Sequence, residues 1–191
     1  EVLGIAGVMY PMNSSHLQDK YFQELKPVIA FVEENYMEDI KMDKLLDFTN
    51  KTALITGAAS GFGKSLAEEL AKRGANLVLA DFNEEGLSQT TAEITALGAN
   101  VVAVAGDVAE EAHAEQLVAA AIETFGRLDI AVNNAGIAPA LGPLTQIDGE
   151  TLSRQLDVNT KGVAFGLKYQ LRAMCAQKDG AILNVSSMAG L

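Results

Sequence analysis

Three closely spaced glycines follow an apolar segment of the chain and precede a sequence typical of a helix. Residues 56–63 read Thr-Gly-Ala-Ala-Ser-Gly-Phe-Gly. Glycine lets the backbone approach a phosphate where a Cβ would collide, and the N-terminus of the following helix offers unpaired N–H groups and a partial positive charge. The pattern therefore predicts a phosphate-binding turn. Its candidate binding residues are Gly57, Ser60, Gly61, Phe62 and Gly63.

A carboxylate stands at the predicted end of the next strand. Asp81 lies a little beyond the distance of about 20 residues from the turn at which an acidic side chain can accept hydrogen bonds from an adenosine ribose. Its charge would repel a 2′-phosphate, and neither Ser60 nor Phe82 is a basic residue that would attract one. These residues favour NAD(H) as the cofactor over NADP(H).

The same turn also has a rival interpretation. Residues 58–65 match the phosphate loop of P-loop NTPases except that Ala58 replaces the first glycine. In such a protein Lys64 would bind the β- and γ-phosphates and Ser65 would bind magnesium. Against this interpretation, Gly57 falls one position too early, and a ribose explains Asp81 better.

The elements that must position these residues alternate regularly after residue 50. Apolar segments typical of buried strands alternate with sequences typical of helices, which requires a parallel sheet covered on both faces. The expected strands are 52–56, 77–80, 100–104, 130–132 and 181–185, and the expected helices are 61–73, 84–97, 110–125 and 148–177. This order predicts a Rossmann-like, doubly wound α/β domain. Ligands bind such a sheet at the carboxyl ends of its strands.

Composition excludes several classes of function. The 191 residues contain 14 basic and 25 acidic side chains, a net charge of −11 that would repel nucleic acid and an anionic bilayer. The longest apolar run, residues 2–12, is shorter than the roughly 20 residues of a membrane-spanning helix. One cysteine, Cys175, cannot form an intramolecular disulfide, and no group of residues has the spacing of a metal site. We therefore expect a cytoplasmic protein with no bound metal.

Residues 1–48 do not follow the alternating pattern and are expected to form a partly helical appendage to a domain at 49–191. Residues 1–20 lack the basic start of a signal peptide. From Pro27 an amphipathic helix is predicted, and residues 26–36 resemble the first helix of AraC-type transcription regulators. The helix-turn-helix that would support DNA binding does not follow, so a packing helix or a fusion remnant is the simpler interpretation.

From about residue 49 to its last residue, the chain resembles the short-chain dehydrogenase/reductase family in several separated motifs. Residues 56–63 fit the family's Thr-Gly-x-x-x-Gly-x-Gly, and residues 133–136 are its Asn-Asn-Ala-Gly. The resemblance implies that Asp107 and Val108 meet the adenine of the cofactor. The family's cofactor cleft would also be lined by Asn134, Ala135 and Gly136.

The resemblance also implies a reaction, hydride transfer between C4 of a nicotinamide and an alcohol or carbonyl carbon of a small substrate. Asn159 falls where the family keeps a catalytic asparagine that holds a water, and Ser187 aligns with the catalytic serine that bonds the substrate oxygen. In the family a tyrosine transfers the hydroxyl proton, and a lysine four residues later lowers the pKa of that tyrosine. The nicotinamide supplies the redox chemistry, and the protein supplies orientation and electrostatics.

The chain departs from the family where that tyrosine is expected. None of its four tyrosines has a lysine four residues later, and the sequence stops a few residues after Ser187. As it stands, we expect the chain to be inactive and to leave the strand at 181–185 as an open edge. It would then be a fragment of a dehydrogenase or a recombinant whose residues 1–48 replace lost packing. A non-catalytic NAD-binding module is the alternative function, and a P-loop NTPase is the second alternative.

Three further features carry weaker expectations. His113 has polar neighbours in the sequence and is expected at the surface, whereas Cys175 is expected to be a small packing residue. The helix predicted at 148–177 offers a surface for a homo-oligomer, and Tyr169 is expected to pack within it or at that interface.

Overall fold

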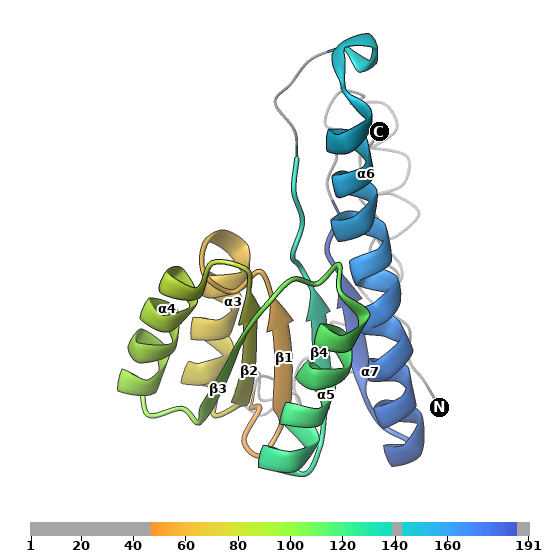
Figure 1. Ribbon diagram of the computed structural model, residues 1–191. Helices are drawn as coiled ribbons and strands as arrows, with labels where there is room; N and C mark the ends of the chain where they lie inside the picture. Colours follow the sequence, from red (N-terminus) through yellow and green to blue (C-terminus); the bar gives the residue numbers. More distant parts are fainter. Residues whose placement is uncertain (1–46, 139–142, 187–191) are drawn as a thin grey trace, which may run out of the picture. The chain divides into compact units, whose positions relative to one another are not determined.

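A central strand, β1, organises the domain in the computed structural model, which describes residues 47–138 and 143–186. All five residues of β1 are buried because the strand has neighbours on both sides and helices over both faces. Figure 1 shows the sheet with α3 and α4 on one face and α5 and α7 on the other. The elements are β1 (Thr52–Thr56), α3 (Gly61–Lys72), β2 (Asn76–Asp81), α4 (Glu84–Ala96), β3 (Val101–Ala105), α5 (Glu111–Phe125), β4 (Ile130–Asn133), a 3₁₀ turn (Leu144–Gln146), α6 (Gly149–Leu156), a π-helical segment (Asp157–Gly162), α7 (Val163–Gln177) and β5 (Ala181–Asn184).

The described strands form a parallel sheet in the order β3-β2-β1-β4-β5. The order runs outward from β1 in one direction through β2 and β3, and in the other through β4 and β5. The reversal between β1 and β4 is the position at which a doubly wound sheet opens a ligand crevice. The predicted Rossmann-like fold is therefore confirmed, and the glycine turn after β1 lies at this reversal.

Alternate residues of the central strands feed two separate cores. Ala53, Ile55 and Leu77 pack against α3 and α4 on one face. Leu54 and Val78 pack on the opposite face, which α5 and α7 cover. Burying both faces removes from water every apolar side chain of β1, which explains why the strand has no polar interior position.

The two edge strands are less buried than the sequence pattern suggested. β3 contains half-buried and exposed residues but no buried one, and β5 is mostly exposed, with Leu183 half accessible to solvent. Among the described residues β5 pairs with β4 alone. Unbroken apolar runs predicted these strands correctly but did not distinguish edge from centre.

The predicted helix 148–177 begins at Gly149 and contains a wider turn. Asp148 caps α6 by accepting a hydrogen bond from the Thr151 N–H at 2.8 Å. The π-helical segment Asp157–Gly162 then separates α6 from α7. Figure 1 shows α6 continuing from α7 beyond the carboxyl ends of the strands. Such π-helical turns are rare, and they occur frequently at functional sites.

The appendage predicted at 1–48 lies almost entirely outside the described residues, as does the helix expected from Pro27. The compact unit of the described chain begins at Phe48, one residue before the expected boundary. The Phe48 N–H donates to the Arg73 carbonyl at 2.9 Å, and its side chain packs against the core beneath α3. Phe48 therefore belongs to the sheet domain.

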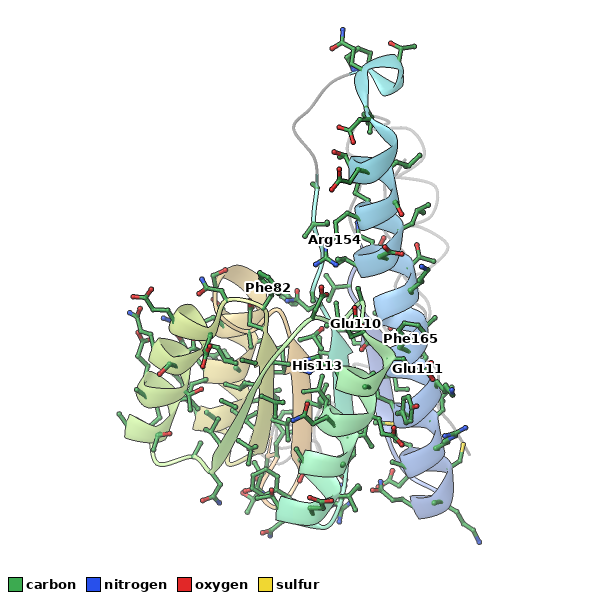
Figure 2. The ribbon with its side chains drawn as sticks, viewed as in Figure 1. Phe82, Glu110, Glu111, His113, Arg154 and Phe165 are labelled. Carbon is green, nitrogen blue, oxygen red and sulfur yellow. The ribbon has the colours of Figure 1, made fainter. Side chains whose placement is uncertain are left out.

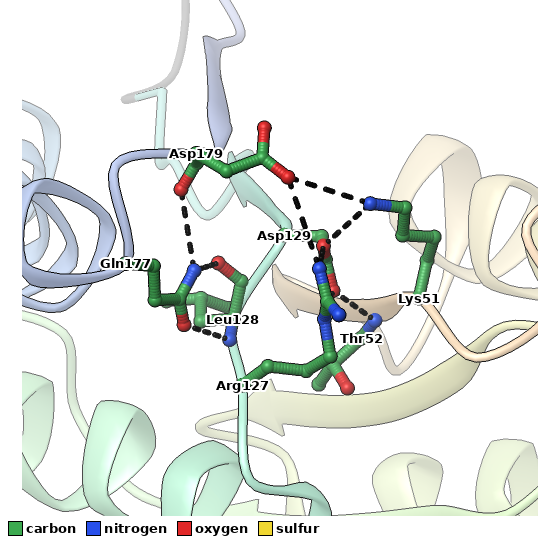
Figure 3. Close-up of polar contacts among 7 residues, drawn as sticks. All are labelled: Lys51, Thr52, Arg127, Leu128, Asp129, Gln177 and Asp179. Atoms are coloured by element: carbon green, nitrogen blue, oxygen red, sulfur yellow. Dashed lines mark hydrogen bonds and ion pairs between the residues drawn. The ribbon is translucent and has the colours of Figure 1, made fainter.

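A buried carboxylate joins the segments at the amino ends of the strands, opposite the crevice (Figure 3). Asp129 is 5% exposed and accepts hydrogen bonds from the Thr52 N–H at 2.9 Å, from Lys51 Nζ at 2.9 Å and from Arg127 Nε at 2.7 Å. Gln177 at the end of α7 bonds both the N–H and the carbonyl of Leu128 at 2.8 Å. These contacts tie the start of β1, the start of β4 and the end of α7 together.

We expect Asp129→Asn to lower the free energy of unfolding by about 2 kcal/mol at neutral pH, because an amide cannot replace the charged hydrogen bonds. Burial raises the pKa of Asp129, but the hydrogen bonds from Arg127, the Thr52 N–H and Lys51 outweigh it and hold the pKa below its ordinary value. The contribution is therefore complete above the unfolded pKa of about 4 and is lost as the pH falls through the folded value. Urea denaturation at neutral pH and at about pH 3 measures it.

Asp179→Asn is the matched control for this prediction. Asp179 lies 3.5 Å from Lys51 and 3.8 Å from Arg127, but its side chain is exposed. Its loss should change stability by less than about 0.5 kcal/mol. Equal effects of the two substitutions, or a stability difference for Asp129→Asn that does not shrink in acid, would contradict the role given to the buried carboxylate.

Candidate functional site

A cleft of about 360 Å³ opens at the carboxyl ends of β1, β2, β3 and β4. The loop that follows each of these strands contributes residues to the cleft, and so does α6. Figure 2 shows Arg154 on α6 and Phe82 after β2, both of which line the cleft. The lining residues are Gly57, Ser60, Asp81, Phe82, Gly106, Asp107, Val108, Asn134, Ala135, Gly136, Ile137, Arg154 and Val158.

The glycine turn is packed too closely for side chains at two of its three glycines. Gly57 has a φ of +69°, and a Cβ there would lie 2.7 Å from Asn134 Nδ2. A Cβ at Gly63 would lie 2.9 Å from the carbonyl carbon of Gly57 and would overlap its oxygen. Gly61 is different, because it has a φ of +55° but open space where a Cβ would lie. Close packing therefore requires glycine at positions 57 and 63, and a positive φ favours glycine at positions 57 and 61.

The N-terminus of α3 faces the turn with its positive end uncompensated. The capping residue Ser60 has no hydrogen bond from its side chain to the helix, and no acidic residue stands in the first turn. Unpaired N–H groups in this setting attract a phosphate. Gly61, Phe62 and Gly63 do not line the cleft, and Phe62 is 57% exposed, so the turn offers its backbone through Gly57 and Ser60.

Thr56 and Asn134 join the turn after β1 to the loop after β4. Thr56 Oγ1 accepts hydrogen bonds from the N–H groups of Asn134 and Ala135, both at 3.0 Å. Asn134 Nδ2 donates to the carbonyls of Thr56 at 2.9 Å and Gly57 at 3.2 Å. The Asn134 amide is thus used to hold the two loops at the crevice, and Ala135 and Gly136 line its wall.

Asp81 is held on both sides by backbone N–H groups. Its Oδ2 accepts from Ala59 in the glycine turn at 2.9 Å, and its Oδ1 accepts from Asn83 at the start of α4, also at 2.9 Å. Phe82 beside it is 75% exposed. The carboxylate therefore stays in one orientation with lone pairs left for a ligand, as the predicted ribose contact requires.

Asn133, which belongs to the motif at 133–136 but was not among the predicted site residues, lies in a buried amide network at the end of β4. Its side chain exchanges two hydrogen bonds with Gln170 of α7, at 2.8 Å and 3.0 Å. It also donates to Asn184 Oδ1 at 2.8 Å, and its carbonyl accepts from the Val185 N–H at 3.0 Å. The network aligns the end of β5 with the cleft. Gln170 lies in none of the sequence motifs, so the sequence did not predict that it contacts Asn133.

Asn159 occupies the π-helical segment and clamps the loop after β4. Its Nδ2 donates to the Ile137 carbonyl at 2.8 Å, and its Oδ1 accepts from the Ile137 N–H at 2.9 Å. Gly162 in the same segment packs on Val108, where a Cβ would lie 2.9 Å from Val108 Cγ2. The wider turn thus meets both neighbouring loops. Ser187, the predicted catalytic serine, lies outside the described residues.

Two weaker expectations were wrong. His113 is 6% exposed, because Gly106 has no side chain to occupy the space taken by its ring. Burial lowers the pKa of His113, against opposing effects of Gln116 and Asp107, so the ring is neutral near pH 7. Cys175 is exposed on α7 rather than packed in the core.

Lys64 does not point into the phosphate-binding turn. Its Nζ forms an ion pair with Glu93 of α4 at 2.6 Å. A P-loop lysine would instead face the β- and γ-phosphates, so the geometry disfavours the NTPase interpretation.

The described residues contain no group of histidine, cysteine, aspartate and glutamate side chains arranged to hold a metal. Within the same part of the chain, no helix is both long and apolar enough to cross a membrane.

Comparison with known proteins identifies the family. The family model for short chain dehydrogenase matches residues 51–191. An uncharacterized oxidoreductase of Thermotoga maritima is 44% identical over 146 residues, which are 76% of this chain and 57% of the relative. Diacetyl reductase [(S)-acetoin forming] of Staphylococcus epidermidis is 43% identical over 142 residues, 74% of this chain and 55% of the relative. The chain thus spans little more than half the length of these relatives.

A solved structure agrees with the sequence relatives. A short chain dehydrogenase/reductase from Burkholderia phymatum in complex with NAD superimposes with a TM-score of 0.73 at 39% identity, over 75% of this chain and 51% of that one. The fold of the described residues, the order of the motifs and the family match all agree. The chain belongs to the short-chain dehydrogenase/reductase family of oxidoreductases.

Proposed function

We propose that this chain is the NAD(H)-binding part of a short-chain alcohol or ketone oxidoreductase. The observation that carries the proposal is the pairing of the uncapped α3 N-terminus with the anchored Asp81 carboxylate in one cleft. The first suits a pyrophosphate, and the second suits the hydroxyls of an unmodified ribose. The NAD complex of the Burkholderia phymatum relative supports the same ligand class.

The preference for NAD(H) over NADP(H) rests on charge. A 2′-phosphate on the ribose would approach Asp81, whose oxygens are held in place by the Ala59 and Asn83 N–H groups. The carboxylate therefore cannot rotate away without losing two hydrogen bonds. Its neighbour Phe82 offers an apolar surface in place of a basic partner for the phosphate.

When bound, the nicotinamide would supply the hydride acceptor or donor. The residues of this chain would bind and orient the dinucleotide: the turn through Gly57 and Ser60 at its pyrophosphate, and the loop after β4 through Asn134, Ala135 and Gly136. Asn159 would fix that loop through Ile137, and with the backbone of its π turn hold a water of the proton relay. Ser187 would bond the substrate oxygen. The diacetyl reductase relative supports a small alcohol or ketone as substrate.

We also propose that the exposed leucines of α6 and α7 form a homo-oligomer interface. Leu152 and Leu156 on α6 and Leu171 on α7 are 42%, 53% and 49% exposed. Apolar side chains along adjoining helices are typical of subunit contacts. Tyr169, whose hydroxyl donates to Glu111 of α5 at 3.2 Å, would support that surface from within the subunit.

We expect the 191-residue polypeptide to bind NADH without oxidising or reducing a substrate, because its sequence contains no Tyr-x-x-x-Lys. Titration of NADH fluorescence should saturate, and NADH at about a hundred times its Kd should stabilise the fold by about 2.7 kcal/mol. ATP with magnesium at the same concentration serves as the control for the NTPase alternative. Protection by ATP with magnesium but not by NADH would reject the proposal, and turnover of a secondary alcohol would reject the expected inactivity.

A further inference from the structure

One cation reaches the cleft from α6. Arg154 Nη2 lies 2.7 Å from Asp107 Oδ2, in the loop that follows β3. Both side chains line the cleft, and Figure 2 shows Arg154 projecting from α6 toward the strand ends. Helix α6 and the loop after β3 are far apart in the sequence, so this ion pair spans the cleft between them.

The carboxylate of Asp107 is held from two directions. Its Oδ1 accepts a hydrogen bond from the Ala109 N–H at 2.9 Å, while Oδ2 meets Arg154. An ionised carboxylate has about four acceptor positions, so these two contacts leave others for a ligand. With both oxygens restrained, the free acceptor positions keep a fixed direction.

Arg154 also balances negative charge in the cleft. Among the described residues that line the cleft, Asp81 and Asp107 are acidic and Arg154 is the one basic side chain. The other nearby cation, Lys64, is paired with Glu93 on α4. Asp107 would therefore be left uncompensated beside an anionic dinucleotide if Arg154 were removed.

The family resemblance implies that Asp107 meets the adenine, with a free carboxylate oxygen accepting a hydrogen bond from the exocyclic amine. We propose that Arg154 is a positioning residue for this contact: it holds the Asp107 carboxylate in the orientation that the contact requires. The inference rests on the proposed NAD(H) function. Arg154 acts through Asp107, with its guanidinium on the carboxylate rather than on the base. It therefore sets selectivity for adenine over a base that lacks the amine.

The test compares NADH with nicotinamide hypoxanthine dinucleotide, in which a carbonyl replaces the 6-amino group. Fluorescence titration should show that the unmodified chain prefers NADH by about tenfold or more, as expected for one hydrogen bond to a charged group. Arg154→Gln and Asp107→Asn should each weaken NADH binding by about tenfold and change the affinity for the hypoxanthine analogue less than about threefold. Because the two residues act as one unit, the double variant should be no weaker than Asp107→Asn alone.

Lys161→Gln is the matched control, since Lys161 pairs with Asp157 at 2.5 Å in the next helical segment and does not line the cleft. It should leave both affinities unchanged. Arg154 is exposed enough for its variant to fold, which circular dichroism verifies, and Arg154→Lys should restore part of the preference for NADH.

Three results would overturn the inference. Equal weakening of both dinucleotides by Arg154→Gln would mean that the guanidinium acts directly on shared parts of the cofactor, and unchanged NADH binding would mean that it does nothing. Additive effects in the double variant would show that Arg154 does not act through Asp107. If the unmodified chain binds neither dinucleotide, the proposed function itself fails, and this inference fails with it.

Discussion

Gly63→Ala is expected to weaken NADH binding by at least about a hundredfold. The added Cβ would overlap the carbonyl oxygen of Gly57 and lie 2.7 Å from Asn134 Nδ2. Neither neighbour can yield, because the oxygen belongs to the backbone and the amide is bonded to Thr56 and Gly57. The turn must therefore move away from α3, and losing one or two hydrogen bonds from its N–H groups to a charged phosphate, each worth about 1.5–3 kcal/mol, weakens binding by a factor of about 100.

Gly149→Ala controls for the general effect of adding a methyl group to a glycine. A Cβ at Gly149, the first residue of α6, meets nothing within 4 Å, and the residue does not line the cleft. Its NADH affinity should match that of the unmodified chain. Fluorescence titration gives the affinities, and thermal denaturation separates a displaced turn from an unfolded domain. A Gly63→Ala protein that folds and binds NADH within threefold of the unmodified chain would refute the packing argument.

Asp81→Ser is expected to lower the ratio of NADH affinity to NADPH affinity by about a hundredfold. The substitution removes hydrogen bonds from a carboxylate to the ribose hydroxyls, each worth about 1.5–3 kcal/mol when the acceptor is charged. It also removes the negative charge that faces a 2′-phosphate. NADH binding should weaken while NADPH binding improves. Adding Phe82→Arg should carry the preference further toward NADPH, because the side chain at that position lines the cleft.

The matched control is Asp179→Ser, which removes the same charge from a position beside Lys51 and Arg127, before the start of β5 (Figure 3). Both affinities should be unchanged, because an exposed charge at this position is screened by salt. Competition titrations with NADH and NADPH at constant ionic strength give the ratios. An Asp81→Ser protein that keeps the original ratio would show that Asp81 does not select between NADH and NADPH. The proposal that the cleft binds a dinucleotide would not be affected by that result.

Most of the fold could be predicted because its signals are local. Each apolar run that became a strand is followed by a sequence with helical spacing, and this alternation permits few arrangements other than a parallel sheet covered on both faces. The signal of the glycine turn is local as well. Its three glycines fall within the seven residues 57–63, between the end of a strand and the first turn of a helix. The predicted helix ends differ from the observed ends by at most one residue.

Two of the expectations that failed depended on contacts made outside the helix concerned. His113 has polar neighbours in sequence, yet the missing side chain of Gly106 makes room for its ring. The helix at 148–177 contains a π turn, at which Gly162 meets Val108 and Asn159 meets Ile137. Sequence periodicity indicates which residues share a face of one helix. It does not indicate which residues of other segments contact that face.

Sequence by itself determined the fold class, the family and the position of the phosphate-binding turn, because these follow from residue types at short, regular spacing. Tertiary structure alone decided which glycines are packed and which are strained, that Lys64 turns to Glu93, and that Arg154 reaches Asp107 across the cleft. Each of the latter depends on where two helices or loops meet when both cores are filled. That placement is a property of the whole packed domain, which no short stretch of sequence encodes.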